Sequence, residues 1–411
     1  MEKESHFKVA VIGGGAAGFF AAIQAKTNFP KAEVILFEKF QKVLSKVKIS
    51  GGGRCNVTNG CNSISELIKG YPRGGKNLKS LFHTFNNIDT QNWFEQRGVA
   101  LKTEADGRVF PQSDSSQTIV DCLFEEIKKL GINLKLGAEI KSLKQVNLSE
   151  IELQFAANYK TQTFQKVIVA SGGSPKLSGL NWLKQLGHKI ETPVPSLFTF
   201  NVPKNPINQL MGLSAPNALI SIQKTKLNNK GPLLITHWGF SGPAVLKLSS
   251  FGARALSDLN YQFNIQINWT GEKNAELVQQ QLAEEFGSNP KKQISNFRMF
   301  ELSNRLWNFL LEKASLNQNK IAGEIGKKQI NKLVETLTND IYTVSGKTTF
   351  KEEFVTCGGV SLNSIDLNTL QSKAIKNLYF AGEVLDIDGI TGGYNFQAAW
   401  STAFLAGKLL T

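Results

Sequence analysis

Apolar runs alternate with glycine-rich turns near the N-terminus. An apolar run at 7–12 precedes a turn at 13–18, helical spacing follows at 19–27, and the run EVILF occupies 33–37. Short apolar runs bounded by turn residues are typical of buried strands. Strand, helix and strand within about thirty residues form the βαβ unit that begins a parallel sheet.

The same alternation continues further along the chain. Residues 115–130 have apolar positions at helical spacing and end before Gly131, a residue suited to a C-cap. Alternating runs at 140–143 and 151–155 flank a polar turn and predict a β-meander. Further short strands are predicted at 132–136, 166–170, 355–360 and 378–382, with a final helix at 395–410.

The middle of the chain has a different pattern. Five prolines between residues 193 and 216 punctuate short alternating strands, and the periodicity is helical from 274 to 338. Strands of this kind favour a small barrel or sandwich. We therefore expect an α/β fold in which a doubly wound domain is interrupted by two inserted domains. The predicted boundaries are 1–190 and 346–411 for the doubly wound domain, 191–272 for a β-barrel, and 273–345 for a helical domain.

Composition excludes several classes of protein. The 411 residues are 41% hydrophobic and 19% charged, which is an ordinary globular balance. The apolar stretch 9–25 imitates a signal peptide, but the flanking Met1–Glu4 is not clearly basic and four glycines interrupt the stretch. We therefore expect a cytoplasmic protein with no membrane partner. The four cysteines lack CxxC spacing and the four histidines lack HxxxH spacing, so neither a disulfide framework nor a metal site is predicted.

Positive charge is concentrated in one segment. The formal net charge is +14, and residues 39–80 hold nine Lys and Arg against one acid, Glu66. The basic residues are Lys39, Lys42, Lys46, Lys48, Arg54, Lys69, Arg73, Lys76 and Lys79. Such a segment attracts cofactor phosphates, an anionic substrate or nucleic acid. For Lys69 to Lys79, a solvated surface without a ligand is an equal alternative.

The turn at 13–18 satisfies G-x-G-x-x-G between a strand and a helix. Gly13 allows the tight turn, Gly15 lets the backbone approach a pyrophosphate, and Gly18 lets the helix pack on the strand. The helix N-terminus, with Ala16 and Ala17, then offers N–H groups to the phosphates. Glu38, at the end of the second strand, is placed to accept hydrogen bonds from ribose hydroxyls. This context predicts a dinucleotide site.

Three further glycine-rich turns indicate a long, extended dinucleotide such as FAD. The first is 50–56, in which Gly51 and Gly52 precede Arg54, a residue placed to neutralise phosphate. The second, 170–173, ends a strand with small residues. The third, 392–395, opens the last helix, whose N-terminus would place positive potential against the N1–C2=O end of a reduced flavin.

Long segments of the chain resemble a known family. KISGGGRCNVTN and YFAGEVLDIDGITGGYNFQAAW, together with Val11–Gly18, Thr236–Ser249 and Cys357–Val360, resemble the bacterial aminoacetone-oxidase-like FAD-binding flavoproteins. That family also contains the 3-dehydro-bile-acid Δ4,6-reductases. The resemblance implies a glutathione-reductase-type FAD-binding doubly wound fold with an inserted β-barrel and helical part. Ser364 and Phe396 depart from the family pattern, and neither bears on the cofactor.

The resemblance also implies which residues hold one non-covalent FAD. It places the 13–18 turn on the pyrophosphate, Glu38 and Lys39 at the adenosine, Ile140 beside the adenine, and Gly393 to Asn395 at the flavin ring. The complete predicted set is Gly13, Gly15, Ala16, Ala17, Gly18, Glu38, Lys39, Lys46, Gly51, Gly52, Arg54, Cys55, Asn56, Ile140, Ala170, Ser171, Gly172, Gly382, Glu383, Gly393, Tyr394 and Asn395. Cys55 and Cys357 are candidates for a flavin tether or for redox thiols, and a structural role is favoured for both. The positive charge of the neighbouring Arg54 favours a lowered pKa of Cys55.

The electron donor and the catalytic acid are separate hypotheses. No second G-x-G-x-x-G unit occurs, so NAD(P)H would reduce the flavin transiently at the face that the substrate later uses. His237, in the segment THWGFSGP, is the candidate general acid, although a hydrogen-bonded interface histidine is the stronger alternative.

Several functions remain open at this stage. The substrate is a small molecule in which a C=C bond conjugated to a carbonyl is reduced, or an amine that is oxidised with O2. A tRNA-modifying role is disfavoured, because residues 271–351 carry twelve Lys and Arg against nine Asp and Glu, without interleaved aromatic residues. A redox-inert use of FAD is a further alternative. The sequence carries no signal for an oligomeric state.

Overall fold

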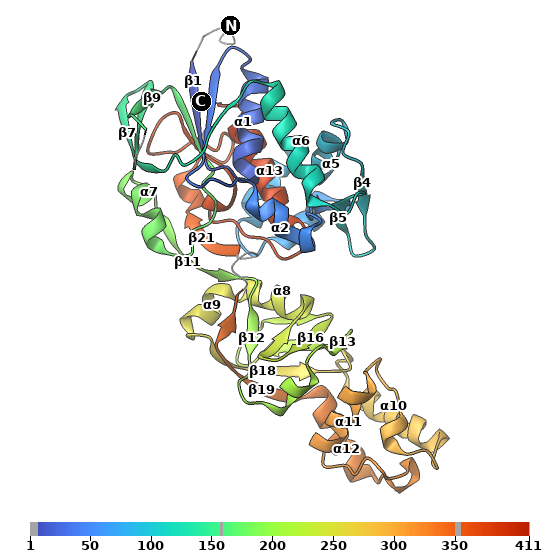
Figure 1. Cartoon of the computed structure of the whole chain (residues 1–411). Helices are drawn as coiled ribbons and strands as arrows, with labels where there is room; N and C mark the ends of the chain where they lie inside the picture. The colour runs from blue at the N-terminus through green and yellow to red at the C-terminus, as the bar shows by residue number, and fades with distance from the viewer. Residues whose placement is uncertain (1–6, 157–158, 350–354, 411) are drawn as a thin grey trace. The chain divides into compact units, whose positions relative to one another are not determined.

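The structure is a computed structural model that describes residues 7–156, 159–349 and 355–410, so Met1–Glu4 lie outside it. The chain divides into two compact units, Met1–Ser196 with Lys351–Thr411, and Leu197–Phe350 (Figure 1). The second unit is thus an insertion into the first. It begins six residues after the predicted start at 191 and ends five residues after the predicted end at 345.

A parallel five-stranded sheet forms the centre of the first unit. Its order is β22 (Leu378–Phe380), β10 (Lys166–Val169), β1 (Lys8–Ile12), β2 (Glu33–Phe37) and β6 (Asn133–Lys135). Nearly all residues of β1, β2 and β10 are buried, as expected for a sheet covered on both faces. The last strand comes from the C-terminus, which confirms the predicted doubly wound α/β fold.

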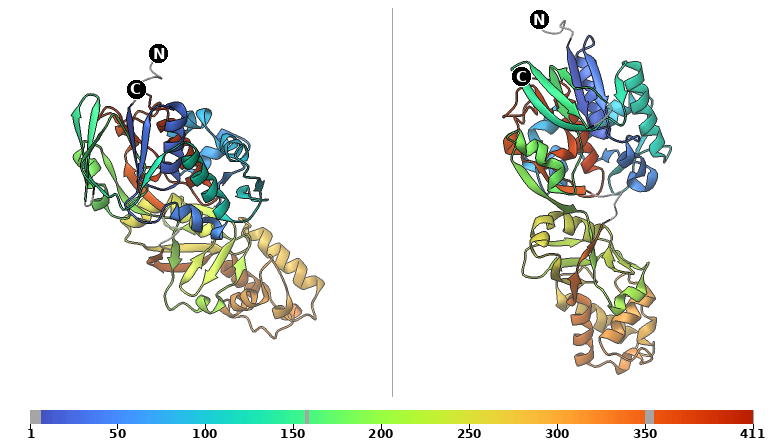
Figure 2. Two further views of the ribbon diagram at one scale, coloured as in Figure 1. Left: turned by 45° about the horizontal axis from the view of Figure 1, so that its top comes forward. Right: turned by 60° about the vertical axis from the view of Figure 1, so that its left-hand side comes forward.

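Helix α1 (Ala16–Asn28) packs between α13 (Tyr394–Ala406) and α6 (Ser116–Lys129) (Figures 1 and 2). Nine consecutive residues of α1 are buried, so the helix lacks the polar face of a surface helix. Phe20 of α1 lies 5.4 Å from Trp400 of α13, measured between ring centroids. The N-terminal and C-terminal segments therefore share one core.

Two smaller sheets flank the central one. The predicted meander is present as β7 (Ile140–Asn147), β8 (Glu150–Phe155) and β9 (Gln162–Phe164). The antiparallel pair β11 (Ile190–Ser196) and β21 (Val355–Val360) lies where the chain leaves and re-enters the first unit. The short helix α7 (Asn181–Gln185) precedes β11.

Residues 45–112 contain structure that the sequence pattern did not reveal. Its helices are α2 (Ser45–Gly53), α3 (Ile64–Leu67), α4 (Gly75–Thr84) and α5 (Asn87–Glu95). Its strands β3 (Thr58–Asn59), β5 (Arg108–Pro111) and β4 (Leu101–Thr103) form an antiparallel sheet. Helix α2 is interrupted at Ser50, Gly51 and Gly52, because the latter two have left-handed φ values of +58° and +70°.

The inserted unit contains two antiparallel sheets rather than one closed barrel. One has the order β13 (Ser214–Ala215), β16 (Leu233–Thr236), β17 (Gly239–Ser241), β12 (Thr199–Asn201) and β20 (Lys347–Thr348). The other has the order β15 (Asn228–Lys230), β14 (Leu219–Ile222), β18 (Gln262–Asn268) and β19 (Asp340–Ser345). Its helices are α8 (Pro243–Phe251), α9 (Ala253–Asp258), α10 (Ala275–Ser288), α11 (Asn304–Lys313) and α12 (Lys327–Thr338).

The predicted division of the insertion at residue 272 cuts through a single core. One hydrophobic cluster joins residues from both sheets with residues from α10, α11 and α12. Asp340, 3% exposed, accepts hydrogen bonds from Trp269 Nε1 (2.9 Å) and the Tyr342 hydroxyl (2.7 Å), and pairs with Lys313. Strand β19 follows the helices in the chain but pairs with β18, so the sheet and the helices form one unit.

Candidate functional site: a dinucleotide cradle and a flavin-side loop

The turn after β1 can only be made with glycine at two positions. Gly13 has a φ of +114°, and a Cβ there would collide with the carbonyl oxygen of Ala170 at the end of β10. A Cβ on Gly18 would collide with the carbonyl oxygen of Gly13. Gly15, in contrast, is exposed, and a Cβ on it would meet no atom within 4 Å. The turn is therefore closed toward the protein and open on the side of Gly15.

The N-terminus of α1 is suited to an anion. The first N–H groups of a helix have no intrahelical acceptor. No side chain caps this helix and its first turn has no acidic residue. The N–H groups that begin at Gly15, Ala16 and Ala17, with the positive end of the helix dipole, thus form the chemical environment that a pyrophosphate requires.

Glu38 lies beside this turn, at the end of β2. Its carboxylate oxygens accept from the backbone N–H groups of Gly14 (2.7 Å) and Phe40 (2.9 Å). Its carbonyl oxygen accepts from Ala138 N (2.8 Å), just before Ile140 begins β7. Lys39, also in the predicted set, has its ammonium 4.8 Å from the centroid of the Phe40 ring. Each oxygen of Glu38 is fixed by one bond, which leaves acceptor capacity for ribose hydroxyls.

Lys46 and Glu383 form an ion pair (2.7 Å) although they are 337 residues apart. The second oxygen of Glu383 accepts from Thr356 N (2.9 Å). Gly382, which precedes Glu383, has a φ of +77°, and a Cβ on it would lie 2.7 Å from the Cβ of Ala17. The loop after β22 therefore lies directly over the start of α1, as ligand-binding loops do at the carboxyl edge of a parallel sheet.

Ala170, Ser171 and Gly172 follow β10 at the same edge. The Ala170 N–H donates to the Ile12 carbonyl (2.8 Å), and the Cα of Ser171 is among the atoms closest to Gly13. Gly172 has a φ of +75°, and a Cβ on it would meet nothing within 4 Å. The ends of β1, β10 and β22 thus bring together glycine-rich turns separated by more than 150 residues in the sequence.

The loop of residues 50–56 has a rare backbone conformation. Gly51, Gly52 and Gly53 all have positive φ, and so does Cys55 (+62°), a residue type that seldom adopts it. Cys55 is fully buried, and burial raises the pKa of its thiol to about 12. The possibility of a lowered pKa, suggested by the neighbouring Arg54, is therefore wrong, because the thiol is enclosed in the core rather than exposed to positive potential.

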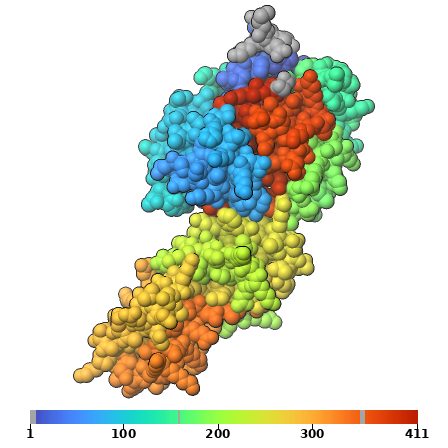
Figure 3. Space-filling view, turned by 180° about the vertical axis from the view of Figure 1, so that it is seen from behind, coloured from blue at the N-terminus to red at the C-terminus, as the bar shows by residue number. Residues whose placement is uncertain are grey.

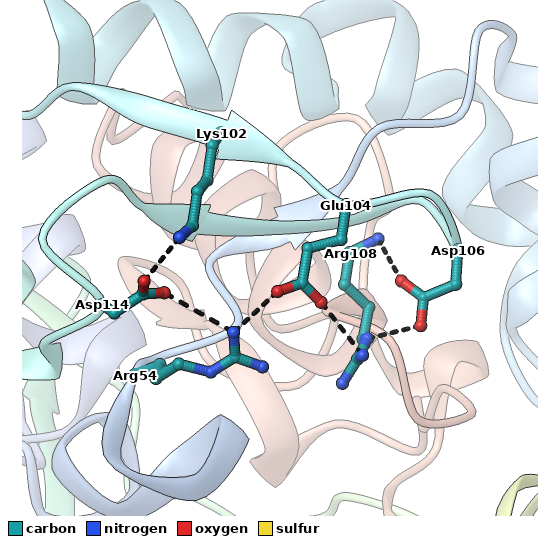
Figure 4. Close-up of polar contacts among 6 residues, drawn as sticks. All are labelled: Arg54, Lys102, Glu104, Asp106, Arg108 and Asp114. Carbon is teal, nitrogen blue, oxygen red and sulfur yellow. Dashed lines mark hydrogen bonds and ion pairs between the residues drawn. The ribbon is translucent and has the colours of Figure 1, made fainter.

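The Arg54 guanidinium forms ion pairs with carboxylates of the first unit. Its guanidinium pairs with Glu104 (2.6 Å) and Asp114 (3.5 Å) and lies 3.9 Å from the centroid of the Phe110 ring (Figure 4). Lys102 also pairs with Asp114 (2.5 Å), and Arg108 with Glu104 (3.0 Å). Lys102, and then Arg54, hold the pKa of Asp114 below its ordinary value. Two carboxylates therefore pair with Arg54 and anchor the glycine loop, and its role in neutralising a cofactor phosphate stays a prediction.

The flavin-side loop, which we define as residues 386–395, is closed by reciprocal side-chain bonds. The Asn395 amide accepts from Gly389 N (2.8 Å) and donates to the Gly389 carbonyl (2.9 Å). Gly393, with a φ of +89°, is the N-cap of α13, and a Cβ on it would collide with the Thr58 carbonyl. No side chain caps α13 and no acid lies in its first turn. The N–H groups that begin at Tyr394 are thus available to a negatively charged group.

Asn56 and Asn59 hold this loop from the other side. The Asn56 amide accepts from Gly393 N (2.9 Å) and donates to the Thr58 carbonyl (3.0 Å). The Asn59 amide donates to the Gly392 carbonyl (3.1 Å). The sequence analysis identified Asn56 but missed Asn59. The available signal was the run RCNVTNG, in which Asn59 follows Asn56 by three residues.

A buried ion pair that the sequence analysis missed also supports the loop. Asp388 is fully buried, pairs with Arg73 through both carboxylate oxygens, and accepts from the Ser196 hydroxyl (2.7 Å). Burial raises the pKa of Asp388, and Arg73 opposes that rise. The available signal was the segment VLDIDGI, in which Asp388 lies among Val384, Leu385, Ile387 and Ile390, since a charged residue within such a stretch indicates a paired charge.

His237 belongs to the inserted unit, whereas every predicted cofactor residue belongs to the first unit. It is exposed in the two-residue turn between β16 and β17, with its ring centroid 4.2 Å from that of Trp238. Trp238 in turn donates to the Thr199 hydroxyl (3.0 Å). The hairpin tip is therefore fixed from inside its own unit, and the role of His237 as a general acid stays a prediction.

The geometry defines a class of protein. A parallel sheet, a glycine cradle at its carboxyl edge, an acceptor carboxylate after β2 and the N-terminus of α13, which begins 378 residues after α1, fit an FAD-binding oxidoreductase. Among the described residues, no group of three His, Cys, Asp or Glu is placed to hold a metal ion. In the same part of the chain, no helix has the length and apolarity needed to cross a membrane.

The chain belongs to the family described as HI0933-like protein Rossmann domain, whose match covers residues 7–409. It is 27% identical to a 3-dehydro-bile acid Δ4,6-reductase of Clostridium scindens over 98% of both chains. It is 29% identical to a ribosomal RNA dihydrouridine synthase of Haemophilus influenzae over 96% of both chains. These comparisons confirm the predicted family and the oxidoreductase class.

Solved structures share the fold at low sequence identity. A 3-ketosteroid-Δ4-(5α)-dehydrogenase of Rhodococcus jostii superposes with a TM-score of 0.51 at 12% identity, covering 98% of this chain and 97% of that one. A 3-ketosteroid Δ1-dehydrogenase of Sterolibacterium denitrificans gives 0.51 at 11% identity, covering 98% and 99%. The likeness confirms the architecture predicted for an FAD-dependent enzyme.

Proposed function

We propose that the protein reduces a C=C bond conjugated to a carbonyl group, with NAD(P)H as electron donor and FAD as the bound carrier. The observation that carries this proposal is that two helices whose N-termini have no side-chain cap, α1 and α13, pack against each other in one unit. One suits the pyrophosphate and the other suits the negative charge of a reduced isoalloxazine.

The names of the relatives support one shared chemistry. A 3-dehydro-bile acid with Δ4,6 unsaturation has its double bonds in conjugation with the C3 carbonyl. Uridine has its C5=C6 bond in conjugation with the C4 carbonyl, and dihydrouridine is the product of reducing it. Reduction of such a conjugated bond adds a hydride to the bond's carbon that is remote from the carbonyl and a proton to its nearer carbon. We infer that this chain does the same chemistry.

The residues of the chain have definable roles in that reaction. FAD, when bound, supplies the hydride. The N–H groups at Tyr394 and Asn395 stabilise negative charge, and the Asn56 bond to Gly393 fixes the direction in which these groups point. His237 is the proposed proton donor. In the overall reaction, NAD(P)H and one proton reduce the C=C bond to a CH–CH bond, and NAD(P)H is oxidised to NAD(P)⁺.

NAD(P)H and the substrate would use the same face in turn. The sequence contains one G-x-G-x-x-G unit, and its surroundings fit the FAD pyrophosphate. A second dinucleotide therefore has no cradle of its own, and this predicts ping-pong kinetics with parallel lines in double-reciprocal plots.

The test is anaerobic half-reaction spectroscopy on the purified holoenzyme. NADPH or NADH should bleach the flavin absorbance, and a water-soluble conjugated enone, or a uridine-containing RNA, should restore it with one mole reduced per mole of flavin. Failure of both nicotinamides to bleach the flavin would overturn the proposal. Bleaching by a primary amine, with H2O2 released on admission of O2, would instead support the amine oxidase alternative.

A further inference from the structure

His188 is a buried histidine whose two ring nitrogens both have hydrogen-bond partners. It lies between α7 and β11 and is 2% exposed. Its Nδ1 is 3.0 Å from the Leu183 carbonyl oxygen, and its Nε2 is 2.8 Å from the Ser372 hydroxyl oxygen. His188 thus bridges α7 and the segment 361–377, which we call the β22 flank. Figure 3 shows the green part of the chain that contains α7 beside the orange-red C-terminal part on one face of the first unit.

The hydrogen bonds determine which ring nitrogen carries the proton. A carbonyl oxygen only accepts, so Nδ1 carries a hydrogen and donates it to Leu183. The Ser372 hydroxyl oxygen accepts from the N–H groups of Ala374 (3.0 Å) and Ile375 (2.9 Å), which occupy its two lone pairs. The hydroxyl hydrogen is therefore donated to Nε2, which carries no proton. All of these bonds are made only when the ring is neutral with its hydrogen on Nδ1.

A second proton on this ring would have no acceptor. The new Nε2–H would point at a hydroxyl oxygen whose lone pairs are already occupied, and the ring would carry a buried positive charge. Among the residues that the structure describes, no carboxylate forms an ion pair with His188. Burial lowers the pKa of His188 below its ordinary value, and the bond to the Leu183 carbonyl opposes that change. The site therefore disfavours the charged ring.

The titratable groups on the elements around His188 do not compensate for such a charge. Those on α7, on residues 189–196, on the β22 flank and on β22 itself are Lys184, Lys189, Glu191, Asp366, Lys373, Lys376 and Tyr379. Two of them are carboxylates. Glu191 pairs with Lys189 (2.8 Å), and Asp366 accepts from Asn368 N (2.9 Å). The other members of the set are basic or phenolic and cannot neutralise an imidazolium at neutral pH.

The β22 flank is bonded to the strand that leads into the proposed cofactor edge. The Ser372 N–H donates to the Leu378 carbonyl (2.7 Å), and the Phe380 N–H donates to the Leu370 carbonyl (3.0 Å). The His188 ring also lies edge-on to the Phe380 ring, with 5.0 Å between the centroids. The end of β22 is therefore held both by the flank and by the ring that fixes the flank to α7.

We propose that His188 is an acid-sensitive lock, in which protonation of Nε2 breaks the bridge between α7 and Ser372 and loosens the strand end that carries Gly382 and Glu383. This inference does not depend on the reaction proposed above. Because the folded state disfavours the charged ring, the unfolded chain binds one more proton as the pH falls below about 6.5. The stabilising contribution of the lock is complete above that pH and is lost as the pH falls toward the lowered folded-state pKa.

The test compares two histidine substitutions in the holoenzyme. His188→Gln keeps an acceptor for the Ser372 hydroxyl and cannot be protonated. His83→Gln is the matched control, because His83 is exposed on α4 and the chemical change is the same. Urea unfolding is followed at about pH 7.5 and about pH 5.5, which bracket the ordinary pKa of histidine. Tryptophan fluorescence reports unfolding, and the fluorescence of released flavin reports loss of the cofactor.

From the higher to the lower pH, the unfolding equilibrium constant should rise roughly fivefold to tenfold more in the wild type and in His83→Gln than in His188→Gln, as expected for one extra proton on the unfolded chain. The urea concentration that releases flavin should fall in parallel. Equal pH dependence of the three proteins in either measurement would overturn the inference.

A second measurement needs no substitution at His188. In the wild type labelled with ¹⁵N-histidine, nuclear magnetic resonance should show one ring that stays neutral, with its hydrogen on Nδ1, at about pH 5.5, where an ordinary histidine is charged. A spectrum in which every histidine ring is charged at that pH while the protein remains folded would overturn the inference.

Discussion

The two halves of the proposed cofactor site are built in different ways. The proposed pyrophosphate half is made by backbone: Gly13 to Gly18 lie in one turn, and the Glu38 side chain, twenty residues after Gly18, accepts from Gly14 N. The flavin half is made by side chains from distant segments, since Asn56 and Asn59 hold Gly393 and Gly392, and Arg73 pairs with Asp388. The first half therefore requires glycine, because a side chain would collide with the backbone. The second half requires particular side chains that bond to one another or to the loop backbone.

The largest effect is expected from a side chain placed in the backbone-built half. Gly13→Ala should lower the free energy of unfolding by more than about 4 kcal/mol, because its Cβ would meet the Ala170 carbonyl and its φ is +114°. Gly15→Ala is the matched control, since its Cβ meets no protein atom. Denaturant unfolding of the apoprotein measures both.

Gly15→Ala also tests whether the cofactor fills the open side of the turn. The apoprotein should unfold within about 0.5 kcal/mol of the wild type, as a substitution without contacts does. Its affinity for FAD should nevertheless fall at least tenfold in a flavin-fluorescence titration, because the pyrophosphate needs the space near Gly15. Unchanged FAD affinity would place the pyrophosphate elsewhere.

The side-chain-built half should be most sensitive at Asp388. Asp388→Ala leaves Arg73 without its carboxylate in a largely buried position and should cost about 3–5 kcal/mol of unfolding free energy. Ser196→Ala removes a hydroxyl that donates to the same carboxylate and accepts from Arg73 Nη2 (3.4 Å), but it removes no charge and should cost about 1 kcal/mol. Equal effects of the two substitutions would show that the ion pair does not hold the loop.

These differences explain what could be predicted from the sequence. The order of strands and the 13–18 turn follow from apolar runs and glycine spacing, which are local properties, and the structure confirms the sheet. The pairing of Lys46 with Glu383 and of Arg73 with Asp388 depends on which distant segments meet, so no local pattern reveals it. The ion pairs of Arg54 escape sequence analysis for the same reason: its sequence neighbours include three glycines, while its partners Glu104 and Asp114 lie in the turns that follow β4 and β5.

A smaller effect is expected where one hydrogen bond orients the N-terminus of α13, the helix end that we propose for the flavin. Asn56→Ala frees the Gly393 N–H and should cost about 1 kcal/mol of stability. It should also shift the flavin reduction potential, measured by dye equilibration, because the N–H groups of α13 would change direction. Asn217→Ala, which removes an exposed bond to Glu301 in the inserted unit, is the control and should leave the potential unchanged. A shift in both variants, or in neither, would contradict the assigned role of Asn56.

The smallest effect is expected at Asp114, an exposed carboxylate that pairs with Arg54 at the end of the glycine loop. Its folded-state pKa is lowered by Lys102 and Arg54, so the carboxylate contributes stability above its ordinary pKa, and that contribution is lost as pH falls through the lowered value. Asp114→Asn should therefore melt slightly below the wild type at pH 7, and the melting temperatures of the two proteins should converge as the pH falls below the ordinary pKa of an aspartate and through the lowered folded-state pKa. Asn tolerates the φ of +51° at this position, so backbone strain does not obscure the comparison. Because Glu104 still pairs with Arg54, FAD affinity should not change. A loss of FAD affinity in Asp114→Asn would mean that the charge network around Arg54 contacts the cofactor directly, and that the flavin half extends further along the glycine loop than the bonds to Asn56 and Asn59 indicate.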